Sequence, residues 1–480
     1  MPPASDSSRR HFLKSTTAAG LVAPTAGALL ASQPATAKAD HHEKEKQELD
    51  PKKGVLFIGT GIRYHTYLGK AAMKHRPCRA ICDVDSVQAG RALQVAMDVH
   101  RQNEWPINSV TYENYQEALK RDDFDVVVIG SPDHWHTKQV IDSLRAGKDV
   151  YCEKPLTLTI HEGNQILKVL EETGRVMQVG TMQRTGFNRR FATAAAMARD
   201  GRVGNMKRVT VALGGSRSCE PLPVVDVPPQ LNWDLYQGPA EVTEYREGPM
   251  VDTAGWGAGH PFARTHRYYR WWYEYSGGKL TDWGAHHVDV AMWGLDKLGR
   301  DIGKVTIDPQ MVKHPVPFKD GMPTDPTRFN CATAFNVLVT FEDGIEMLVT
   351  HNAGDLGFGN GVMFQGDRGR YLVNRGKLVG KPVEDLKDNP LPEDAITNLY
   401  GCDPHGDHMT NFFHCVESRE QPVSDVASHH RMLSICHGIN IAMRLGRKLT
   451  FDTATDTFVG DDQANTFVQR KQRAGFEIDA

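Results

Sequence analysis

Three groups of residues in this 480-residue chain have types and spacings that could do chemistry. Lys154 directly precedes a proline, Asp282 and His286 are four residues apart, and Gly59 and Gly61 follow an apolar run. A lysine can donate to an oxygen, an imidazole can carry a proton near neutral pH, and a glycine turn lets backbone N–H groups approach a phosphate. These groups must be positioned by elements that lie far apart in the sequence.

Lys154 is predicted to lie at the carboxyl end of a buried strand. Residues 126–129 form an apolar run without polar alternation, which is typical of a parallel strand covered on both faces. A helix is expected over 137–146, ended by Gly147, and a second strand over 149–152 leads into the lysine. Ligands bind at such strand ends in doubly wound sheets. From its position alone, Lys154 is either a site residue or a surface residue that precedes a proline.

The glycine pair is predicted to bind the phosphates of a dinucleotide. Residues 55–58 form an apolar strand, Gly59 permits a tight turn, and Gly61 lets the backbone approach a pyrophosphate before a helix over 62–73. The phosphates would lie at the helix N-terminus, where free N–H groups and the helix dipole favour an anion. Asp83, at the end of the second strand, can accept from a ribose hydroxyl and would repel a 2′-phosphate, which favours NAD over NADP.

The dinucleotide fingerprint is incomplete, because Tyr64 occupies the position of its third glycine. That glycine normally allows the helix to pack closely on the strand, so its loss weakens the motif without removing the phosphate contact. Strands alternate with helices over about 125 residues of this half, which predicts an α/β fold with a doubly wound parallel sheet.

Asp282 and His286 allow two interpretations. A helix is expected from residue 280 onward, and the two side chains then share one face. The simpler interpretation, which the spacing alone favours, is an ion pair on a helix surface. In the catalytic interpretation Asp282 orients or polarises His286, whose ordinary pKa of about 6.5 suits proton transfer at neutral pH.

The segments GTG after the first strand, CDVD, SPDHWH, YCEKP and GGKLTDWGAHHVD resemble those of the glucose–fructose oxidoreductase / inositol dehydrogenase / rhizopine catabolism (Gfo/Idh/MocA) family. The resemblance implies a Rossmann domain followed by an α+β domain with a large, mainly antiparallel open sheet, and homo-oligomers (dimers or tetramers) packed through that sheet. It also aligns Lys154, Asp282 and His286 with the family's catalytic positions, which favours the catalytic interpretation, and it selects His286 rather than the adjacent His287.

Hydride transfer from a secondary alcohol of a carbohydrate to NAD is the chemistry that suits this set. His286 would take the hydroxyl proton, and Lys154 would donate to the oxygen that becomes the carbonyl. Asp133 and His136 are expected near the nicotinamide ribose. The residues predicted to bind the cofactor are Gly59, Gly61, Ile62, Asp83, Ser131, Asp133, His136, Glu153 and Lys154.

The N-terminal segment resembles a bacterial twin-arginine export signal. Arg9 and Arg10 precede Phe-Leu-Lys, an alanine-rich run and a small-x-small site at 35–37, and the run is too short for a stable membrane span. We therefore expect export to the periplasm, with the cofactor already bound. The predicted domains are the signal at 1–37, a charged linker at 38–52, the NAD-binding domain at 53–180, a substrate and oligomerisation domain at 181–450 and a C-terminal arm at 451–480.

Composition points away from several other classes of protein. A net charge of −3 gives no indication of nucleic acid or an anionic membrane. The eight cysteines form no CxxC pair, and the ligand types at 404–408 lack an evident third and fourth ligand, so no metal site is predicted. Six of the eight tryptophans fall between residues 233 and 293, and they either line a sugar pocket or pack the domain junction.

Further strands and helices are expected in the second half of the chain. Two hairpins are predicted, 333–340 with 345–351 and 363–365 with 370–373, followed by helices over 408–419 and 428–445.

Three functions remain open. They are an NAD-dependent sugar oxidoreductase, a redox-neutral glycosidase that oxidises, eliminates, hydrates and reduces, and a binding protein on a degenerate scaffold. An exported enzyme has no exchangeable NAD pool and must regenerate its cofactor in each cycle. It could do so by oxidising one sugar and reducing another or by the glycosidase route, so we give net redox-neutral chemistry weight equal to net dehydrogenation. Only Tyr64 supports the scaffold.

Overall fold

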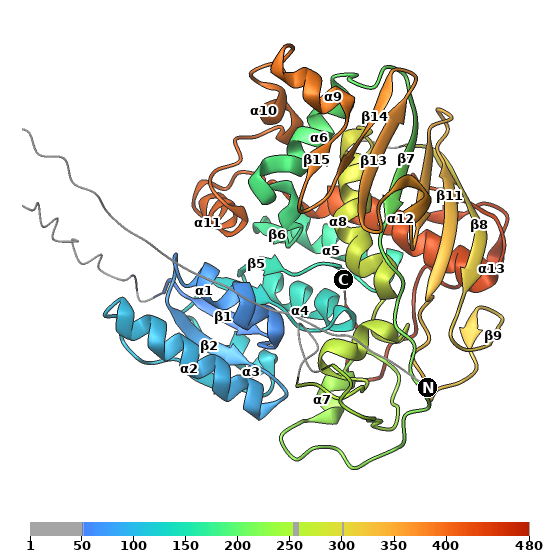
Figure 1. The fold of residues 1–480 in the computed structure, drawn as a ribbon. Coiled ribbons are helices and arrows are strands. Elements are labelled where there is room, and N and C mark those ends of the chain that lie inside the picture. The colour runs from blue at the N-terminus through green and yellow to red at the C-terminus, as the bar shows by residue number, and fades with distance from the viewer. Residues whose placement is uncertain (1–49, 51, 253–258, 300–301, 480) are drawn as a thin grey trace, which may run out of the picture. The chain divides into compact units, whose positions relative to one another are not determined.

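The computed structural model describes residues 50, 52–252, 259–299 and 302–479, so the predicted signal peptide and Trp256 lie outside it. The first sheet has six parallel strands in the order β3-β2-β1-β4-β5-β6 (Figure 1). The strand order reverses between β1 and β4, and doubly wound sheets bind dinucleotides at the carboxyl ends of the strands at such a point. The predicted Rossmann fold is confirmed.

Strand limits in this sheet follow from the buried apolar runs. β1 (Val55–Ile58), β4 (Val126–Ile129) and β5 (Asp149–Cys152) have the predicted limits, and every residue in them is buried. Helix α4 (Asp133–Arg145) starts four residues before the prediction, and Gly147 beyond its end has the expected left-handed φ of +74°. The other elements here are β2 (Cys78–Cys82), β3 (Val110–Tyr112), β6 (Met177–Val179), η1 (Tyr64–Leu68), α1 (Gly69–Ala72), α2 (Ser86–Gln102), α3 (Tyr115–Leu119) and α5 (Ile160–Thr173).

The second sheet has nine strands in the order β15-β14-β13-β7-β12-β11-β8-β16-β17. Its described pairs are antiparallel except for β7 with β12, and both predicted hairpins are present. β8 (Lys304–Lys313) has no counterpart among the sequence predictions, because Pro309 and several polar residues interrupt its pattern. The remaining strands are β7 (Met206–Ala212), β11 (Ala334–Thr340), β12 (Glu346–Thr350), β13 (Gly361–Gly366), β14 (Gly369–Val373), β15 (Leu378–Val379), β16 (Leu449–Asp452) and β17 (Thr457–Phe458), beside a small pair β9 (Phe318–Lys319) and β10 (Met322–Pro323).

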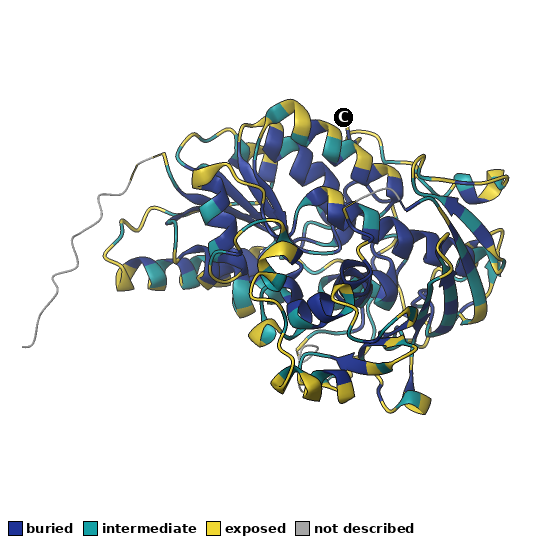
Figure 2. Cartoon of the chain, turned by 90° about the horizontal axis from the view of Figure 1, so that it is seen from above, coloured by how far each residue is buried: buried dark blue, intermediate teal, exposed yellow. Residues whose placement is uncertain are grey.

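Two long helices connect this sheet to the Rossmann domain. α8 (Gly278–Gly294) packs on β7 and β13 and against α12 (Val426–Leu445), which also contacts β8 and α5. Most residues of both helices are buried, and Figure 2 shows the interior of the described chain in dark blue. The second turn of α8 lies at the carboxyl end of β5, because Asp282 on this turn bonds to Lys154, which follows that strand. The other helices are η2 (Met182–Arg184), η3 (Phe187–Arg189), α6 (Arg190–Arg199), α7 (Trp233–Gln237), η5 (His266–Trp271), η6 (Gly354–Leu356), α9 (Lys381–Glu384), η7 (Asp385–Lys387), α10 (Ala395–Tyr400), α11 (His408–Ser418) and α13 (Asp462–Asn465).

The C-terminal segment has two parts. Its beginning belongs to the large sheet, since β16 pairs with β8. Beyond α13 the chain contacts α5 of the Rossmann domain, where Arg470 Nε is 2.6 Å from Glu162 Oε1. It also contacts α7, where Arg473 pairs with Asp234. Of the helices that the structure describes, none has both the length and the hydropathy of a membrane span.

Candidate active site

Lys154 and Asp282 form an ion pair that joins the two domains. Lys154 follows β5 at the carboxyl end of the parallel sheet, and Asp282 lies in the second turn of α8. Lys154 Nζ is 2.6 Å from Asp282 Oδ1 and 2.8 Å from the Asp282 main-chain oxygen. The two side chains are 13% and 15% exposed, so the pair borders solvent without being open to it.

His286 lies one turn further along α8 and is buried. No described residue provides a hydrogen-bond partner for its Nδ1. Asp282 binds Lys154 instead of His286, so the direct polarisation suggested by their spacing is not observed. Burial lowers the pKa of His286 well below the ordinary 6.5, and the positive charges of Lys154 and Arg375 lower it further. The imidazole is therefore neutral at neutral pH and able to accept a proton.

Asp282 stays ionised in spite of its burial. Burial alone would raise the pKa of its carboxyl, but the ammonium of Lys154 and the guanidinium of Arg270 outweigh that effect and hold the pKa below its ordinary value. Arg270 Nε is 3.8 Å from Asp282 Oδ1. The carboxylate thus supplies a fixed negative charge that keeps the Lys154 ammonium in one place.

The neighbouring His287 has a different role. Its Nδ1 accepts from Gln183 Nε2 at 3.1 Å, and its Nε2 lies 2.9 Å from Asn360 Oδ1. Both ring nitrogens are therefore bonded within the protein, and burial lowers the pKa of His287 to about 4. This agrees with the selection of His286 as the proton carrier.

The turn after β1 has the shape that a dinucleotide site needs. Gly59 has φ of +78°, and a Cβ there would lie 2.4 Å from Ser131 N, so the loop after β4 leaves no room for a side chain. A Cβ on Gly61 would meet no atom within 4 Å, so this backbone faces open space. Ile62 follows, half-buried, at the start of the helical segment. The residues present therefore fit the pyrophosphate of NAD.

Asp83 braces this turn. Its Oδ2 accepts from Thr60 N at 2.7 Å and from Thr60 Oγ1 at 3.0 Å, while Asp85 N donates to Oδ1 at 2.9 Å. Burial raises the pKa of the Asp83 carboxyl. Its contact with a ribose hydroxyl stays a prediction, made from its position beside the cavity described below.

Tyr64 does not disable the phosphate-binding helix. Its ring is buried edge-on against Phe57, with centroids 5.0 Å apart, and its hydroxyl donates to Ala92 O at 3.1 Å. The helix widens to a π-helix over η1, and a Cβ on Gly69 would lie 2.7 Å from the tyrosine ring. Gly69 thus supplies the small residue that the fingerprint lacks, five positions later.

A cavity of about 170 Å³ lies beside the glycine turn. Its wall includes Asp83 and Ser131 and, from the C-terminal segment, Gly475 and Phe476. The Phe476 ring packs edge-on against Trp135 on α4, with centroids 5.7 Å apart. The cavity lies at the Asp83 side of the turn, where the adenosine half of a dinucleotide would bind. A larger hollow of about 610 Å³, around Arg202 and Pro390, includes none of these groups.

The other predicted cofactor residues are tied to neighbouring loops. Ser131 Oγ donates to Gln139 Oε1 at 2.6 Å. The two ring nitrogens of His136 lie 2.8 Å from the carbonyl oxygens of Ser131 and Pro155, so this side chain joins the loops after β4 and β5. Asp133 accepts from Tyr269 Oη at 2.9 Å and from Ser276 Oγ at 2.5 Å. All three are buried, and the bonds that they make position the strand-end loops.

Glu153 pairs with an arginine of the phosphate-binding helix. Arg63 Nε is 2.6 Å from Glu153 Oε1, and this carboxylate fills the space beside Gly180. The Glu-Lys-Pro segment therefore contacts both sides of the junction, Arg63 through the glutamate and α8 through Lys154. Sequence reasoning missed Arg63, although its place two residues after Gly61 is a usable signal.

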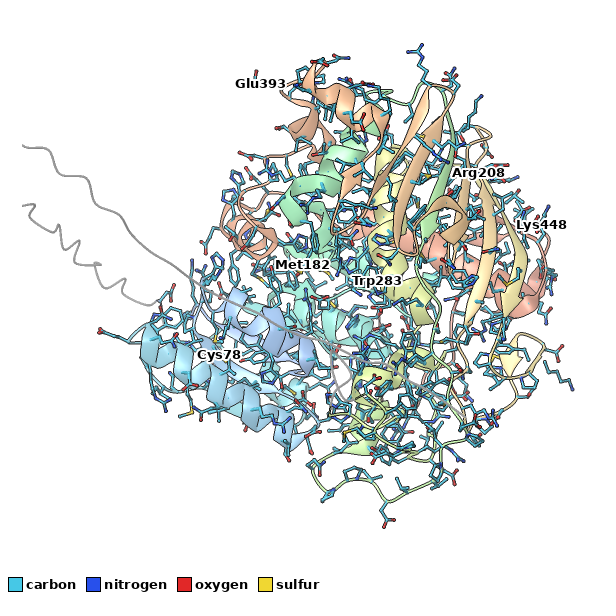
Figure 3. The ribbon with its side chains drawn as sticks, viewed as in Figure 1. Cys78, Met182, Arg208, Trp283, Glu393 and Lys448 are labelled. Atoms are coloured by element: carbon cyan, nitrogen blue, oxygen red, sulfur yellow. The ribbon has the colours of Figure 1, made fainter. Side chains whose placement is uncertain are left out.

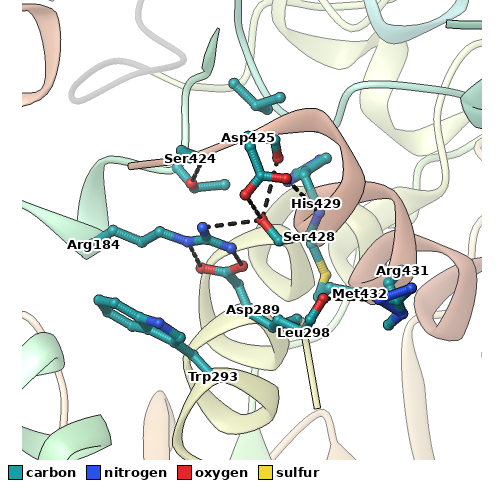
Figure 4. A network of polar contacts seen from close by, with 12 residues as sticks. Arg184, Asp289, Trp293, Leu298, Ser424, Asp425, Ser428, His429, Arg431 and Met432 are labelled. Atoms are coloured by element: carbon teal, nitrogen blue, oxygen red, sulfur yellow. Dashed lines mark hydrogen bonds and ion pairs between the residues drawn. The ribbon is translucent and has the colours of Figure 1, made fainter. Parts of the chain in front are cut away.

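A second buried ion pair fixes α8 (Figure 4). Arg184 in η2 makes two bonds to Asp289 on α8, Nε–Oδ2 at 3.0 Å and Nη2–Oδ1 at 2.6 Å. Arg184 Nη1 also donates to Val423 O and to Ser428 Oγ on α12. This network was not predicted, because its members lie about a hundred positions apart or more and no local pattern marks them.

Most of the aromatic cluster serves packing. Trp271 and Trp272 are buried with Tyr268 and Tyr275 in one apolar cluster. Trp283, on α8 between Asp282 and His286, is instead half-buried and lies where the domains meet (Figure 3). The packing interpretation therefore holds for the first four, whereas the Trp283 ring contacts His286, with centroids 6.1 Å apart.

The ligand types at 404–408 are engaged in other ways. Asp407 caps α11 by accepting from Thr410 N, and His408 Nε2 lies 2.9 Å from Val179 O. In the described part of the chain, ligand atoms of His405, His414 and Glu420 lie within 4.8 Å of one another at the surface. Three such groups are short of a closed structural zinc site, and we assign them no role.

The fold and the site define a dinucleotide-binding oxidoreductase with a catalytic domain built on a second sheet. Residues 53–181 match the oxidoreductase family with an NAD-binding Rossmann fold, and residues 215–478 match the C-terminal alpha/beta domain of the same oxidoreductase family. The chain therefore belongs to the Gfo/Idh/MocA family of oxidoreductases. The predicted boundary at residue 180 stays a prediction.

Curated proteins of the genus Shewanella are similar to part of this chain. An alpha-N-acetylgalactosaminidase of Shewanella oneidensis is 31% identical over 212 residues, 41% of this chain and 44% of that protein. A glycosyl hydrolase family 109 protein of Shewanella sp. (strain ANA-3) is 32% identical over the same shares. The match thus spans less than half the length of these curated relatives.

Solved structures share the fold. The WlbA dehydrogenase from Bordetella pertussis, in complex with NADH and UDP-GlcNAcA, has a TM-score of 0.54 at 18% identity, with 83% of this chain and 98% of that chain covered. An aldose-aldose oxidoreductase from Caulobacter crescentus, complexed with glycerol, has a TM-score of 0.50 at 16% identity, covering 83% and 99%.

Proposed function

We propose that this protein transfers hydride between a secondary hydroxyl of a sugar or glycoside and a tightly bound NAD. The observation that carries the proposal is the convergence of Lys154, Asp282 and His286 at the carboxyl end of the Rossmann sheet, where α8 meets β5. Family membership supports it, since the Rossmann half is NAD-binding.

The roles of the three residues follow from their surroundings. NAD, when bound at Gly59 and Gly61, would supply the hydride acceptor. Lys154, fixed by Asp282, is placed to donate to the substrate oxygen and to stabilise the negative charge that grows there as hydride leaves carbon. His286, whose imidazole is neutral because its pKa is lowered, takes the hydroxyl proton.

Removal of the proton carrier tests this assignment. We expect His286→Ala and Lys154→Ala each to lose about a thousandfold in turnover, while the purified variants still release NAD on denaturation. His161→Ala, on the exposed face of α5, is a matched control and should retain activity. Full activity in His286→Ala would refute the mechanism.

A redox-neutral glycosidase is the second candidate. It is favoured by the relative named alpha-N-acetylgalactosaminidase, although less than half of that protein is matched. Oxidation of one ring carbon would acidify the neighbouring C–H, the leaving group would be eliminated, water would add and the returning hydride would restore the alcohol, so the net change is hydrolysis. We would first measure NAD released by the denatured protein. One equivalent per chain, with free sugar but no net NADH from glycosides, supports this route, and an empty protein that needs added NAD supports a dehydrogenase.

We further propose export of the folded, NAD-loaded protein to the periplasm through the twin-arginine pathway. The support is the order of features in residues 1–37. Replacing both Arg9 and Arg10 by lysine should retain the protein in the cytoplasm, and periplasmic fractionation measures this. Unchanged export of the double variant would contradict the proposal.

We also propose a homo-oligomer, dimer or tetramer, built through the second sheet. The family resemblance supports it, as does the half-buried apolar pair Leu338 and Leu348, which lie opposite each other on the sheet face away from the core. Light scattering should give more than one chain per particle, and Leu338→Glu should reduce the mass. A monomeric parent protein would contradict the proposal.

A further inference from the structure

We propose that the substrate carries an anionic group, a carboxylate or a sulfate ester, which binds between Lys279 and Arg375. This rests on the proposed function, because it names the class of sugar that the same site would take. The two cations lie beside Trp283 on the side of the site formed by the second domain.

Both positive charges lie over one indole ring. Lys279 Nζ is 5.1 Å and Arg375 Cζ 4.5 Å from the centroid of Trp283. Lys279 is in the first turn of α8 and Arg375 follows β14, so two separate elements bring their cations to the same ring. Both cationic residues are half-buried. The Trp283 ring lies edge-on against His286, with centroids 6.1 Å apart, so the arrangement borders the proposed catalytic site.

Neither cation has a carboxylate partner among the described residues. Arg375 Nε donates to the neutral Gln183 Oε1 at 3.2 Å, and the Lys279 ammonium lies near Gly214. Of the other cations nearby, Arg63 pairs with Glu153, whereas Lys154 and Arg270 share the single carboxylate of Asp282. The wall of the site thus has more positive than negative charge.

Unpaired half-buried cations are costly to the folded protein. Burial lowers the pKa of Lys279 and of Arg375. The negative charge of Asp282 partly opposes this effect for both, while Lys154 lowers the pKa of the first further and Arg63 that of the second. Such groups are stabilised by an anion that enters the site, and the attraction is stronger there than in open water. A guanidinium offers a fork that matches the oxygens of a carboxylate or sulfate, while a lysine adds a point charge.

The anion is not expected to be the pyrophosphate of NAD. That group has its own site at Gly59 and Gly61, beside Arg63, whereas Lys279 and Arg375 come from the second domain. An experiment on the NAD-loaded protein separates the two, because the pyrophosphate is then already in place.

The test measures binding to the NAD-loaded protein by calorimetry and by tryptophan fluorescence. The probes are inorganic sulfate and methyl glycosides of glucose and galactose, each as the neutral sugar, the 6-carboxylate and the 6-sulfate. The variants are Lys279→Gln and Arg375→Gln, with Lys377→Gln as the matched control, since Lys377 is exposed on the same segment as Arg375. We expect the anionic probes to bind and each site variant to weaken them about tenfold or more, with the control unchanged. Retained NAD shows that a variant is folded, and Arg375→Lys should recover part of the affinity.

Two outcomes overturn the proposal. One is equal or stronger binding of the neutral sugars, and the other is sulfate and anionic glycosides that bind the three glutamine variants alike or do not bind at all. Stronger binding of the carboxylates or of the sulfates identifies which anion the site takes. Failure of the proposed function is a separate result: the anions bind through Lys279 and Arg375, but no probe changes the bound NAD or is cleaved. Conversely, either of the two overturning outcomes, found together with turnover of neutral glycosides, retains the function and rejects the anion site.

Discussion

Helix α8 carries two ion-paired aspartates seven residues apart, and their surroundings differ. Asp289 and Arg184 are 0% and 4% exposed, joined by two hydrogen bonds, and the guanidinium makes further bonds to the protein (Figure 4). Asp282 pairs with Lys154 at the edge of solvent, and more cations than it can neutralise surround it. One helix thus holds a closed pair that fixes its position and an open pair that leaves charge available to a ligand.

The largest effect is expected at the closed pair. Arg184→Met leaves the Asp289 carboxylate buried without its partner, which should lower the free energy of unfolding by about 3–5 kcal/mol. Denaturant unfolding of the NAD-loaded protein measures this. The double variant Arg184→Met/Asp289→Leu should recover most of the loss, because no buried charge then remains. A single variant as stable as the parent would remove the distinction between the pairs.

Asp282→Asn, at the open pair, should reduce activity strongly and stability only slightly. Without the fixed negative charge, Lys154 is no longer held against the substrate oxygen, and we expect kcat/KM to fall about a hundredfold. The free energy of unfolding should change by only about 1 kcal/mol, because solvent reaches this pair. Asp355→Asn, at an exposed position of η6, is the matched control. A large loss of stability with activity retained would make the open pair structural as well.

The sequence predicted the Rossmann half better than the second sheet, for a local reason. β1, β4 and β5 are covered on both faces, so each is a continuous apolar run that ends at a turn residue. β8 has one open face and contains Pro309, and its pattern identifies no strand until its partners are known.

The same limit applies to the site. Local patterns and family resemblance were enough to select Lys154 and His286. The spacing of Asp282 and His286 showed only that they share a helix face, whereas the partner of Asp282 lies 128 residues away. Gly69 compensates for Tyr64 through a change of helix type that no spacing rule anticipates. Contacts between residues far apart in the sequence depend on the tertiary fold, and the sequence-based predictions missed these contacts.

The pH dependence of kcat/KM tests the protonation of His286, which lies one turn from the open pair on α8. The lowered pKa of His286 means that the imidazole stays neutral, and able to accept a proton, below pH 6.5. We expect kcat/KM for oxidation to be unchanged between pH 7.5 and about 5.5, where a histidine of ordinary pKa would already lose about tenfold. Activity should fall only as pH drops through the lowered pKa. Half-maximal activity near pH 6.5 would contradict a buried, cation-flanked base.

Acid unfolding sets the lowest pH at which this activity can be measured. His287 and His408 are buried, with pKa values lowered to about 4. The unfolded chain binds their protons from about pH 6.5 downward while the folded protein does not, so stability falls as pH drops from there towards 4. Unfolding midpoints at each pH separate loss of fold from protonation of His286.

The smallest effect is expected at the wall of the nucleotide cavity, away from both of the ion pairs on α8. Phe476→Ala removes the ring that lies against Trp135 and lines the cavity beside the glycine turn. An edge-to-face ring contact is worth about 1 kcal/mol, so NAD should dissociate about fivefold faster while hydride transfer in the loaded protein is unchanged. Stopped-flow release of NAD measures the first quantity and a single turnover the second. If dissociation is unchanged, the C-terminal segment covers the Rossmann side without holding the cofactor, and retention depends on the glycine turn and its own neighbours alone.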